Sequence, residues 1–148
     1  MLISVSAHQR ATPFASLERL AALGGDAAPH LHGAHESVQG AVVLSTCNRF
    51  EAYVDVDVDP DVDSPLPAID AVLEQLASLT DLPYRDLRSS VEISSGNRVA
   101  HHLFSVASGL ESVAVGEDEI AGQVRRALDM AREHGVTSSP LEHLFQRA

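Results

Sequence analysis

The only cysteine of the chain, Cys47, lies in the segment Ser45-Thr46-Cys47-Asn48-Arg49 between two apolar stretches. A lone cysteine within an apolar run is usually an inert part of the core. Cys47 instead follows such a run, and a hydroxyl, an amide and a guanidinium surround it. A positive charge beside a partly open strand end favours the reactive thiolate form of a cysteine. The position therefore indicates a nucleophile.

A thiolate nucleophile usually works with an acid–base group, and the chain contains eight histidines. His30, His32 and His35 lie close together but have no carboxylate or cysteine at metal-ligand spacing, so we interpret them as surface residues and predict no metal site. His101 and His102 lie within an apolar helical segment. Helical periodicity does not choose between them, and it leaves open whether either is an acid–base group or a hydrogen-bonded histidine at the edge of the core.

Composition and charge exclude several classes of protein. The chain has 148 residues, and its ten basic residues are all arginine against 21 acidic ones, which gives a net charge of −11. A general nucleic-acid or anionic-membrane surface needs many more cations. One cysteine excludes a disulfide framework or a cysteine-rich zinc site. Without a signal-like or membrane-spanning segment, we expect a cytoplasmic protein that does not engage membranes.

The elements that would position Cys47 follow from the apolar patterning. The predicted strands cover 2–6, 41–45, 52–58 and 91–93. We expect 41–45 to be a central strand covered on both faces, and 52–58 to place Tyr53, Asp55 and Asp57 toward solvent. Helices are predicted from Thr12-Pro13 to Gly24-Gly25 and over 65–79, with 29–40 as a surface connection that can include one turn of helix. This order predicts an α+β fold, a ferredoxin-like βαββαβ sandwich with additional C-terminal helices.

The additional helices are predicted over 97–107, 118–134 and from 140 onward. Ser139-Pro140-Leu141-Glu142 has the pattern of a capping box with proline at the first helical position. Because no cap or glycine follows Leu144 and Phe145, we expect this helix to continue in a longer protein. The predicted organisation is a catalytic domain over 1–136 and the truncated start of a connecting helix over 137–148.

Two sequence blocks resemble the N-terminal catalytic domain of glutamyl-tRNA reductase. The block from Val42 to Glu51 (VVLSTCNRFE) is similar to the family signature around its nucleophilic cysteine, and the block from His102 to Ala127 is similar to a second signature. A weaker match lies at 8–13. The chain departs from the family pattern at Val5, where glycine is usual, and at Glu119, where glutamine is usual.

The resemblance implies specific roles. Cys47 would be the nucleophile, and His102 would be the histidine of the pair that matters for activity, either orienting the ester or assisting proton transfer. The residues implied to line the glutamyl pocket are Thr46, Asn48, Arg49, Ser112, Glu117, Asp118, Glu119 and Gln123. Arg49 suits the side-chain carboxylate of a glutamyl group. Glu119 has two open interpretations, a pocket residue or a first-turn acid that favours the helix macrodipole.

The implied reaction is attack of Cys47 on the glutamyl-tRNA ester, followed by reduction of the thioester by NADPH to glutamate-1-semialdehyde for tetrapyrrole synthesis. The chain has no G-x-G-x-x-G pattern, so NADPH would be bound by a domain absent from it, and we expect this chain alone to show only esterase activity. The implied partners are glutamyl-tRNA(Glu) as substrate, a second copy in a full-length homodimer, and glutamate-1-semialdehyde aminotransferase as a channelling partner. Two alternatives stay open, a stand-alone thiol hydrolase and a non-catalytic ferredoxin-like binding module.

Overall fold

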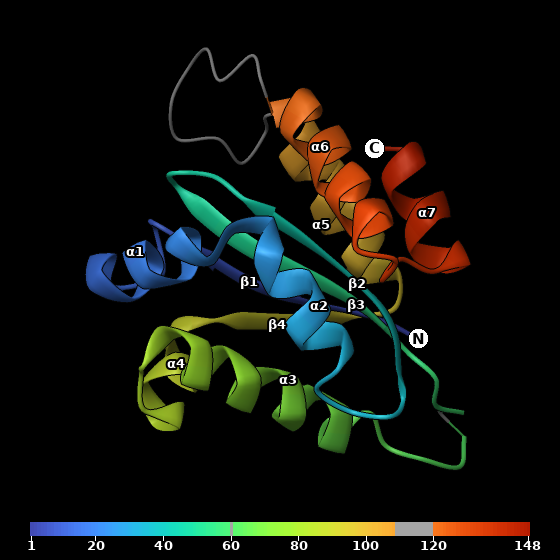
Figure 1. Ribbon diagram of the computed structural model, residues 1–148, viewed down its shortest axis with the longest axis horizontal. Helices are drawn as coiled ribbons and strands as arrows, with labels where there is room; N and C mark the ends of the chain where they lie inside the picture. The colour runs from blue at the N-terminus through green and yellow to red at the C-terminus, as the bar shows by residue number, and fades with distance from the viewer. Residues whose placement is uncertain (60, 109–119) are drawn as a thin grey trace.

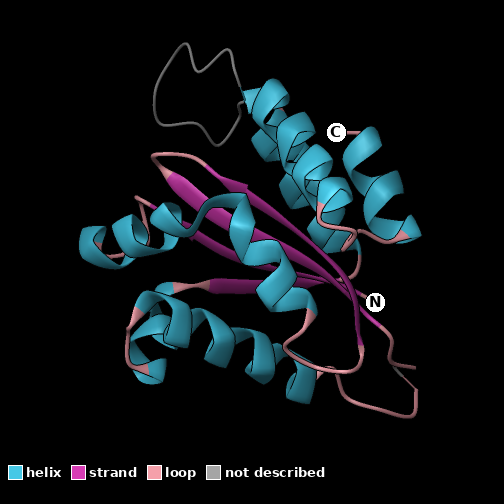
Figure 2. Cartoon of the chain, viewed as in Figure 1, coloured by secondary structure: helices cyan, strands magenta, loops and turns pink. Residues whose placement is uncertain are grey.

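The computed structural model describes residues 1–59, 61–108 and 120–148, and in these ranges helices pack on both faces of one antiparallel sheet (Figures 1 and 2). The strands are β1 (Leu2–His8), β2 (Val38–Ser45), β3 (Arg49–Val56) and β4 (Glu92–Ser95). The helices of the described ranges are α1 (Phe14–Leu23), α2 (Ala27–His32), α3 (Leu66–Thr80), α4 (Tyr84–Ser90), α5 (Asn97–Ala107), α6 (Ile120–Glu133) and α7 (Ser139–Gln146), with a short 3-10 helix, η1 (Gly24–Asp26). The prediction of an α+β fold is confirmed.

The sheet has the strand order β2-β3-β1-β4 with four antiparallel strands. In the β1–β3 pair, Ser6 lies opposite Glu51 and His8 lies opposite Arg49. Because side chains alternate along a strand, Arg49, Glu51 and Tyr53 share one face of the sheet. The ring of Tyr53 meets that of Phe145 of α7 edge-on, with 5.1 Å between ring centroids. This face is therefore covered by the C-terminal helices.

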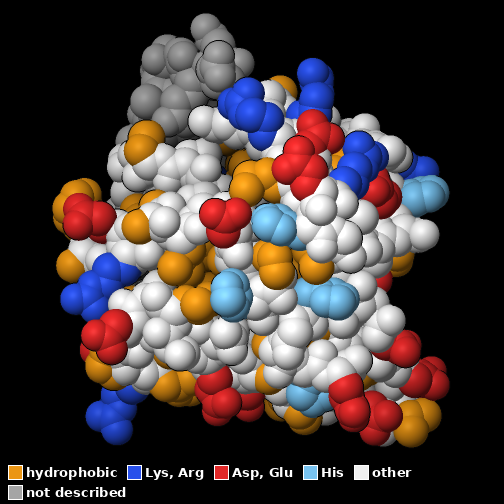
Figure 3. All heavy atoms as spheres, in the orientation of Figure 1, with side chains coloured by type: hydrophobic (Ala, Val, Ile, Leu, Met, Phe, Trp, Pro, Cys, Tyr) orange, Lys and Arg blue, Asp and Glu red, His pale blue; other side chains and the backbone are white. Residues whose placement is uncertain are grey.

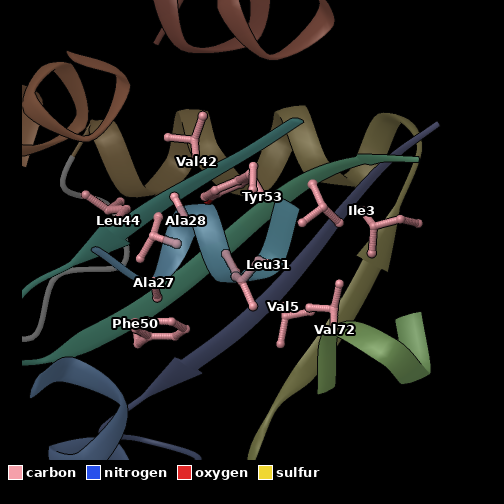
Figure 4. Close-up of a cluster of buried hydrophobic side chains, with 14 of the residues drawn as sticks. Ile3, Val5, Ala27, Ala28, Leu31, Val42, Leu44, Phe50, Tyr53 and Val72 are labelled. Carbon is pink, nitrogen blue, oxygen red and sulfur yellow. The ribbon is translucent and has the colours of Figure 1, made fainter. Parts of the chain in front are cut away.

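The opposite face holds much of the apolar core. Along β3, Phe50, Ala52 and Val54 are at most 1% exposed. They alternate with Arg49, Glu51 and Tyr53, which point to the other face of the sheet. In Figure 4, Phe50 and Val72 lie on the side away from α5, whereas Val42 and Tyr53 lie on the side that faces α5. The sheet therefore separates an apolar layer from one in which polar side chains are buried.

The predicted central strand is instead an edge strand. β2 pairs only with β3 in the described sheet, yet Ala41, Val42 and Val43 are at most 2% exposed. Both faces are covered because α2 packs on β2 and α6 packs along it as well. An unbroken apolar run indicates that both faces of a strand are buried. It does not indicate whether the strand pairs with one neighbouring strand or with two.

Two further expectations hold only in part. The turn of helix expected within 29–40 is present as the end of α2, but Ala28 and Leu31 of this helix are buried, so it is not a surface connection. Tyr53 and Asp55 of β3 are buried instead of facing solvent, because α5 and α7 cover that face, whereas Asp57, just after β3, is exposed as expected. Polar side chains at alternate positions therefore marked a buried polar layer, which the period-two pattern does not distinguish from a wet surface.

The helix starts also differ in detail from the prediction. Thr12 does not cap α1, since Pro13 occupies the cap position and the Thr12 hydroxyl donates to the backbone oxygen of Ser90. At α7 the cap is Ser138 rather than Ser139, and its side chain accepts from the backbone N–H of Leu141. Adjacent serines offer the same hydroxyl, so tertiary contacts decide which one caps.

Within the described ranges, every helix is too short or too polar to cross a lipid bilayer.

Candidate active site

Cys47 lies at the tip of the β2–β3 hairpin. The turn is closed by a 2.9 Å hydrogen bond from the Thr46 N–H to the Arg49 carbonyl, and the Asn48 N–H donates to the Thr46 hydroxyl at 3.2 Å. The Cys47 side chain is exposed and makes no hydrogen bond within the described residues. The expectation of a partly open position is confirmed, and a thiol held on a short turn is accessible to a substrate.

A cavity of about 470 Å³ opens beside Cys47. It runs along the outer edge of β2, with the end of α1 and η1 on one side and α6 on the other. Thr46 and Cys47 line it from the hairpin, and Gln123, Arg126 and Met130 line it from α6. Gly25 leaves room for the Met130 side chain, because a Cβ at Gly25 would lie 2.5 Å from the Met130 sulfur.

The carboxylate of Glu51 is buried on the polar face of the sheet, two residues after Arg49 at the start of β3. Glu51 is fully buried, and one of its oxygens, Oε2, accepts from the Arg49 guanidinium at 2.8 Å and lies 2.5 Å from His102 Nε2. The other, Oε1, accepts from the Tyr53 hydroxyl at 2.5 Å. Ser6 Oγ lies 3.2 Å from His102 Nε2. Three donors from β3 and α5 therefore converge on one carboxylate.

The charge state of Glu51 follows from this arrangement. Burial by itself raises the pKa of the Glu51 carboxyl. The opposite effect comes from the hydrogen bond and charge of His102, the hydrogen bond from Tyr53 and the charge of Arg49. Together these lower the pKa of Glu51 below its usual value of 4.5. An ionised carboxylate accepts hydrogen bonds only, so Nε2 of His102 carries the hydrogen of that bond. Glu51 thus fixes the orientation of the imidazole.

A second cavity, of about 270 Å³, lies over this network. His8, Arg10, Arg49, Glu92 and His102 line it. The structure therefore brings Arg49 and His102 together, and it brings Cys47, Thr46 and Gln123 together, but the two groups line different cavities on either side of the hairpin end. The imidazole of His102 is directed at Glu51 and Ser6, so the structure contains a hydrogen-bonded histidine at the edge of the core.

The remaining predicted site residues divide into two groups. Asn48 lies in the hairpin turn and is half-buried. Ser112, Glu117, Asp118 and Glu119 lie outside the described residues. Glu51 and Tyr53 had no predicted role, although the spacing of Arg49, Glu51 and Tyr53 places three hydrogen-bonding side chains on one face of a strand. That spacing was the signal for the buried network, whereas Arg10 and Glu92 left no comparable signal in the sequence.

The chain matches known proteins over its length. The family profile described as "Glutamyl-tRNAGlu reductase, N-terminal domain" matches residues 5–148. A glutamyl-tRNA reductase of Clavibacter michiganensis is 47% identical over 148 residues, which are 100% of this chain and 34% of that protein. One from Tropheryma whipplei is 44% identical over 100% of this chain and 33% of its own length.

A solved structure gives the same result. Glutamyl-tRNA reductase from Methanopyrus kandleri matches with a TM-score of 0.74 and 30% identity, covering 99% of this chain and 32% of that one. The chain thus spans about a third of the length of the relatives it matches.

Proposed function

Because the chain belongs to the glutamyl-tRNA reductase family, matching the profile of its N-terminal domain, we propose that it carries out acyl transfer from glutamyl-tRNA to Cys47. The observation that carries the proposal is the exposed thiol of Cys47 at a hairpin tip, two residues before Arg49, which belongs to a hydrogen-bonded network with Glu51 and His102. An accessible sulfur meets the first requirement for nucleophilic catalysis.

The proposed step transfers the glutamyl group from the terminal ribose of tRNA to the Cys47 sulfur. The Cys47 thiolate attacks the ester carbonyl carbon, a carbon–sulfur bond forms, and the bond from that carbon to the oxygen of the terminal ribose breaks. The ribose oxygen takes up a proton and free tRNA leaves. With water as the next nucleophile, the thioester gives free glutamate and restores the thiol, which is the esterase activity proposed for this chain alone.

The predicted site residues have proposed roles that match their surroundings. Arg49 presents its guanidinium to the cavity that it shares with His102, where it can donate to an acidic acyl group. His102, held by Glu51, would orient the ester or assist the proton transfer. Thr46, Asn48 and Gln123 would contact the substrate beside Cys47, as would Ser112, Glu117, Asp118 and Glu119.

NADPH does not fit the residues that the structure describes. A dinucleotide site of the usual kind needs a parallel strand–turn–helix unit with a glycine-rich turn, whereas β1 leads into α1 through a turn without glycine and the described sheet is antiparallel. We assign NADPH, which would supply hydride to the thioester, to the part of the full-length protein beyond this chain.

The wider proposals come from the family. The full-length protein would be a cytoplasmic, NADPH-dependent glutamyl-tRNA reductase of tetrapyrrole synthesis and a homodimer, with glutamate-1-semialdehyde aminotransferase as a channelling partner. The strand order β2-β3-β1-β4 supports the ferredoxin-like assignment of the sheet and its first helices. We also retain the proposed division into a catalytic domain over 1–136 and a connecting helix from 137.

The test is direct detection of the acyl-enzyme. The chain is mixed with glutamyl-tRNA, quenched in acid and examined by intact-mass spectrometry, and we expect a gain of one glutamyl group that hydroxylamine removes. Cys47→Ser should show no gain and an unchanged circular dichroism spectrum, because Cys47 is exposed and makes no hydrogen bond with described residues. Equal ester hydrolysis by Cys47→Ser would exclude Cys47 as the nucleophile, and no transfer by the unmodified chain would favour a non-catalytic module.

A further inference from the structure

The cavity beside Cys47 extends well beyond the thiol. Its volume of about 470 Å³ lies within the range of about 300–1,000 Å³ that is typical of pockets for small organic molecules. Four residues of α6 line it: Gln123, Arg126, Ala127 and Met130. They are spaced at i, i+3, i+4 and i+7, so they lie on one face of the helix, which rises about 10 Å from the first to the last. The cavity is therefore an elongated pocket between α6 and the outer edge of β2.

The direction of α6 decides which of these residues lies nearest the thiol. The Ala41 N–H of β2 donates to the Val136 carbonyl, just after α6, at 2.8 Å. The C-terminal end of α6 therefore lies beside the start of β2, and the helix runs back along the strand toward the hairpin tip (Figure 1). This direction places Gln123 at the end of the pocket with Cys47, and Met130 further along the strand.

The deeper part of the pocket is apolar and is bounded by a glycine. Val43 and Met130 line it together with the backbone of Gly24 and Gly25. The Met130 sulfur lies so close to Gly25 that a Cβ there would be 2.5 Å from it. A methionine sulfur makes favourable contacts with aromatic rings. The far end of the pocket is therefore suited to a flat, uncharged ring.

The wall opposite α6 is held in place by a hydrogen bond. The Ser45 hydroxyl donates to the Ala21 carbonyl at 3.0 Å, which ties the end of α1 to the end of β2. Both residues line the pocket. The pocket is thus formed by the packing of described elements before any ligand binds.

Arg126 gives the pocket a cation on its open side. The residue is exposed, and a Cβ at Gly122 would lie 3.4 Å from the Arg126 Nη1 atom. The guanidinium therefore lies over the preceding turn of α6, toward the end of the pocket that holds Cys47. A guanidinium at this place can donate hydrogen bonds to a phosphate group.

The proposed acyl transfer leaves this pocket to the leaving group. When the sulfur attacks the ester carbonyl, the acyl chain and the terminal ribose extend from that carbon in different directions. Arg49, proposed to bind the acyl carboxylate, lines the cavity on the other side of the hairpin end, whereas Cys47 lines the pocket along β2. The ribose and its base are the part of the substrate that this pocket can receive.

We propose that the pocket between β2 and α6 binds the terminal nucleoside of the tRNA, with its base against Met130 and its 5′ phosphate on Arg126. This inference deepens the proposed function and rests on it, because it names the part of the leaving group that the chain recognises. A single base in an apolar pocket and one phosphate contact need no extended basic surface. The site is therefore compatible with the net charge of −11.

The kinetic test uses three esters that share the L-glutamyl group and differ in the alcohol. The alcohols are adenosine 5′-monophosphate, adenosine, and methyl riboside, which has no base. For Met130→Ala we expect kcat/KM to fall about tenfold with both adenosine esters and to stay unchanged with the riboside ester. Met130→Leu keeps an apolar side chain of similar size and should restore most of the loss.

The phosphate contact is tested with the same three esters. For Arg126→Gln we expect kcat/KM to fall about tenfold with the monophosphate ester and to stay nearly unchanged with the other two. Arg125→Gln is the matched control, because Arg125 is the neighbouring exposed arginine of α6 but lines the groove toward α7 instead. It should change none of the three values.

The outcomes separate this inference from the proposed function. Equal loss with all three esters, or no loss with any, would overturn the nucleoside assignment while acyl transfer to Cys47 stands. Loss in Arg126→Gln with the riboside ester would place Arg126 on the acyl group or the thiolate, and would likewise overturn its assignment to the phosphate.

A binding measurement covers the case in which the unmodified chain transfers no acyl group. The chain has two methionines, Met1 and Met130, so methyl-labelled methionine gives one NMR signal inside the pocket and one outside it. The Met1 amino group donates to the Val56 carbonyl at 2.8 Å, at the end of β3 away from Arg49.

Adenosine 5′-monophosphate should shift the Met130 signal in a saturable way and leave the Met1 signal in place. Adenosine should shift the same signal, and Arg126→Gln should weaken binding of the monophosphate about tenfold but leave that of adenosine unchanged. No shift of the Met130 signal, or equal shifts of both signals, would overturn the inference whether or not the chain transfers an acyl group.

Discussion

Glu51 of β3 and His102 of α5 are 51 positions apart in the chain, yet Nε2 of His102 lies 2.5 Å from Oε2 of Glu51. The carboxylate is fully buried and the imidazole side chain is 17% exposed, so the pair extends from the core to the cavity that Arg49 also lines. The contact joins the sheet to a helix of the covering layer and sets the direction of the imidazole. Several measurable consequences depend on it.

Replacing Glu51 with glutamine should destabilise the protein strongly. The substitution removes the negative charge that faces Arg49 and His102 in a buried position, and leaving one buried charge without its partner costs about 3–5 kcal/mol. Chemical denaturation of Glu51→Gln measures this loss. Glu133→Gln, at an exposed position of α6, is the control and should stay within about 0.5 kcal/mol of the unmodified chain. A Glu51→Gln variant as stable as that control would mean that the network contributes little.

The same carboxylate predicts how stability depends on pH. Its pKa in the folded protein is lowered, so its contribution is fully present above the ordinary value of 4.5 and is lost as the pH falls through the folded value. Unfolding free energies measured across the acidic range should therefore fall with decreasing pH. The fall should be shallower in Glu51→Gln. Parallel curves for the two proteins would contradict the assignment of an ionised Glu51.

Two hydroxyls on directly opposed residues should respond differently to removal. Tyr53 donates to Glu51, whereas Ser4, its partner across β1 and β3, has a buried hydroxyl with no hydrogen bond to described residues. Tyr53→Phe keeps the ring contact with Phe145 but takes a donor from a buried carboxylate, at a cost of about 1–3 kcal/mol. Ser4→Ala should be neutral or stabilising, because the Ser4 hydroxyl is desolvated without compensation. Thermal melts of both variants test this contrast, and equal losses would refute it.

Gly40 of β2 should tolerate no side chain. A Cβ there would lie 3.0 Å from both the backbone nitrogen and the Cβ of Ser138, where the segment between α6 and α7 crosses the strand. Gly40→Ala should cost about 1–3 kcal/mol through this overlap. Gly33→Ala meets only ordinary contacts at 3.5 Å or more and should be neutral or slightly stabilising. The difference in denaturation midpoint between the two alanine variants is the measurement.

This chain by itself should bind tRNA weakly. Its net charge is −11, and on the face shown in Figure 3 basic side chains lie next to acidic ones over α6 and α7 instead of forming a continuous basic surface. Arg132, for example, is paired with Glu142 at 2.5 Å. Phosphate contacts dominate the affinity of most RNA-binding surfaces. Fluorescence anisotropy with labelled tRNA at physiological salt should give weak binding, and a submicromolar dissociation constant would contradict this.

The sequence by itself determined most of the elements and indicated Cys47 as the candidate nucleophile. Apolar periodicity located the strands beginning at Leu2 and Glu92 to within a few residues, because burial of one face imposes a repeat that survives in any fold. The hydrogen-bonding neighbours of Cys47 marked the end of β2, and the structure places the thiol on an exposed turn there.

Only the tertiary structure decided which side chains meet. Strand order made β2 an edge strand, and the helices packed over β3 turned an apparently wet face into a buried one that holds Glu51 and Tyr53. Register across β3, β1 and β4, together with the turn after β1, brought Arg49, Glu92 and Arg10 to one cavity, whereas Cys47 lines another. The physical reason is that periodicity records whether a side chain is covered, whereas its partners depend on contacts between segments far apart in the chain.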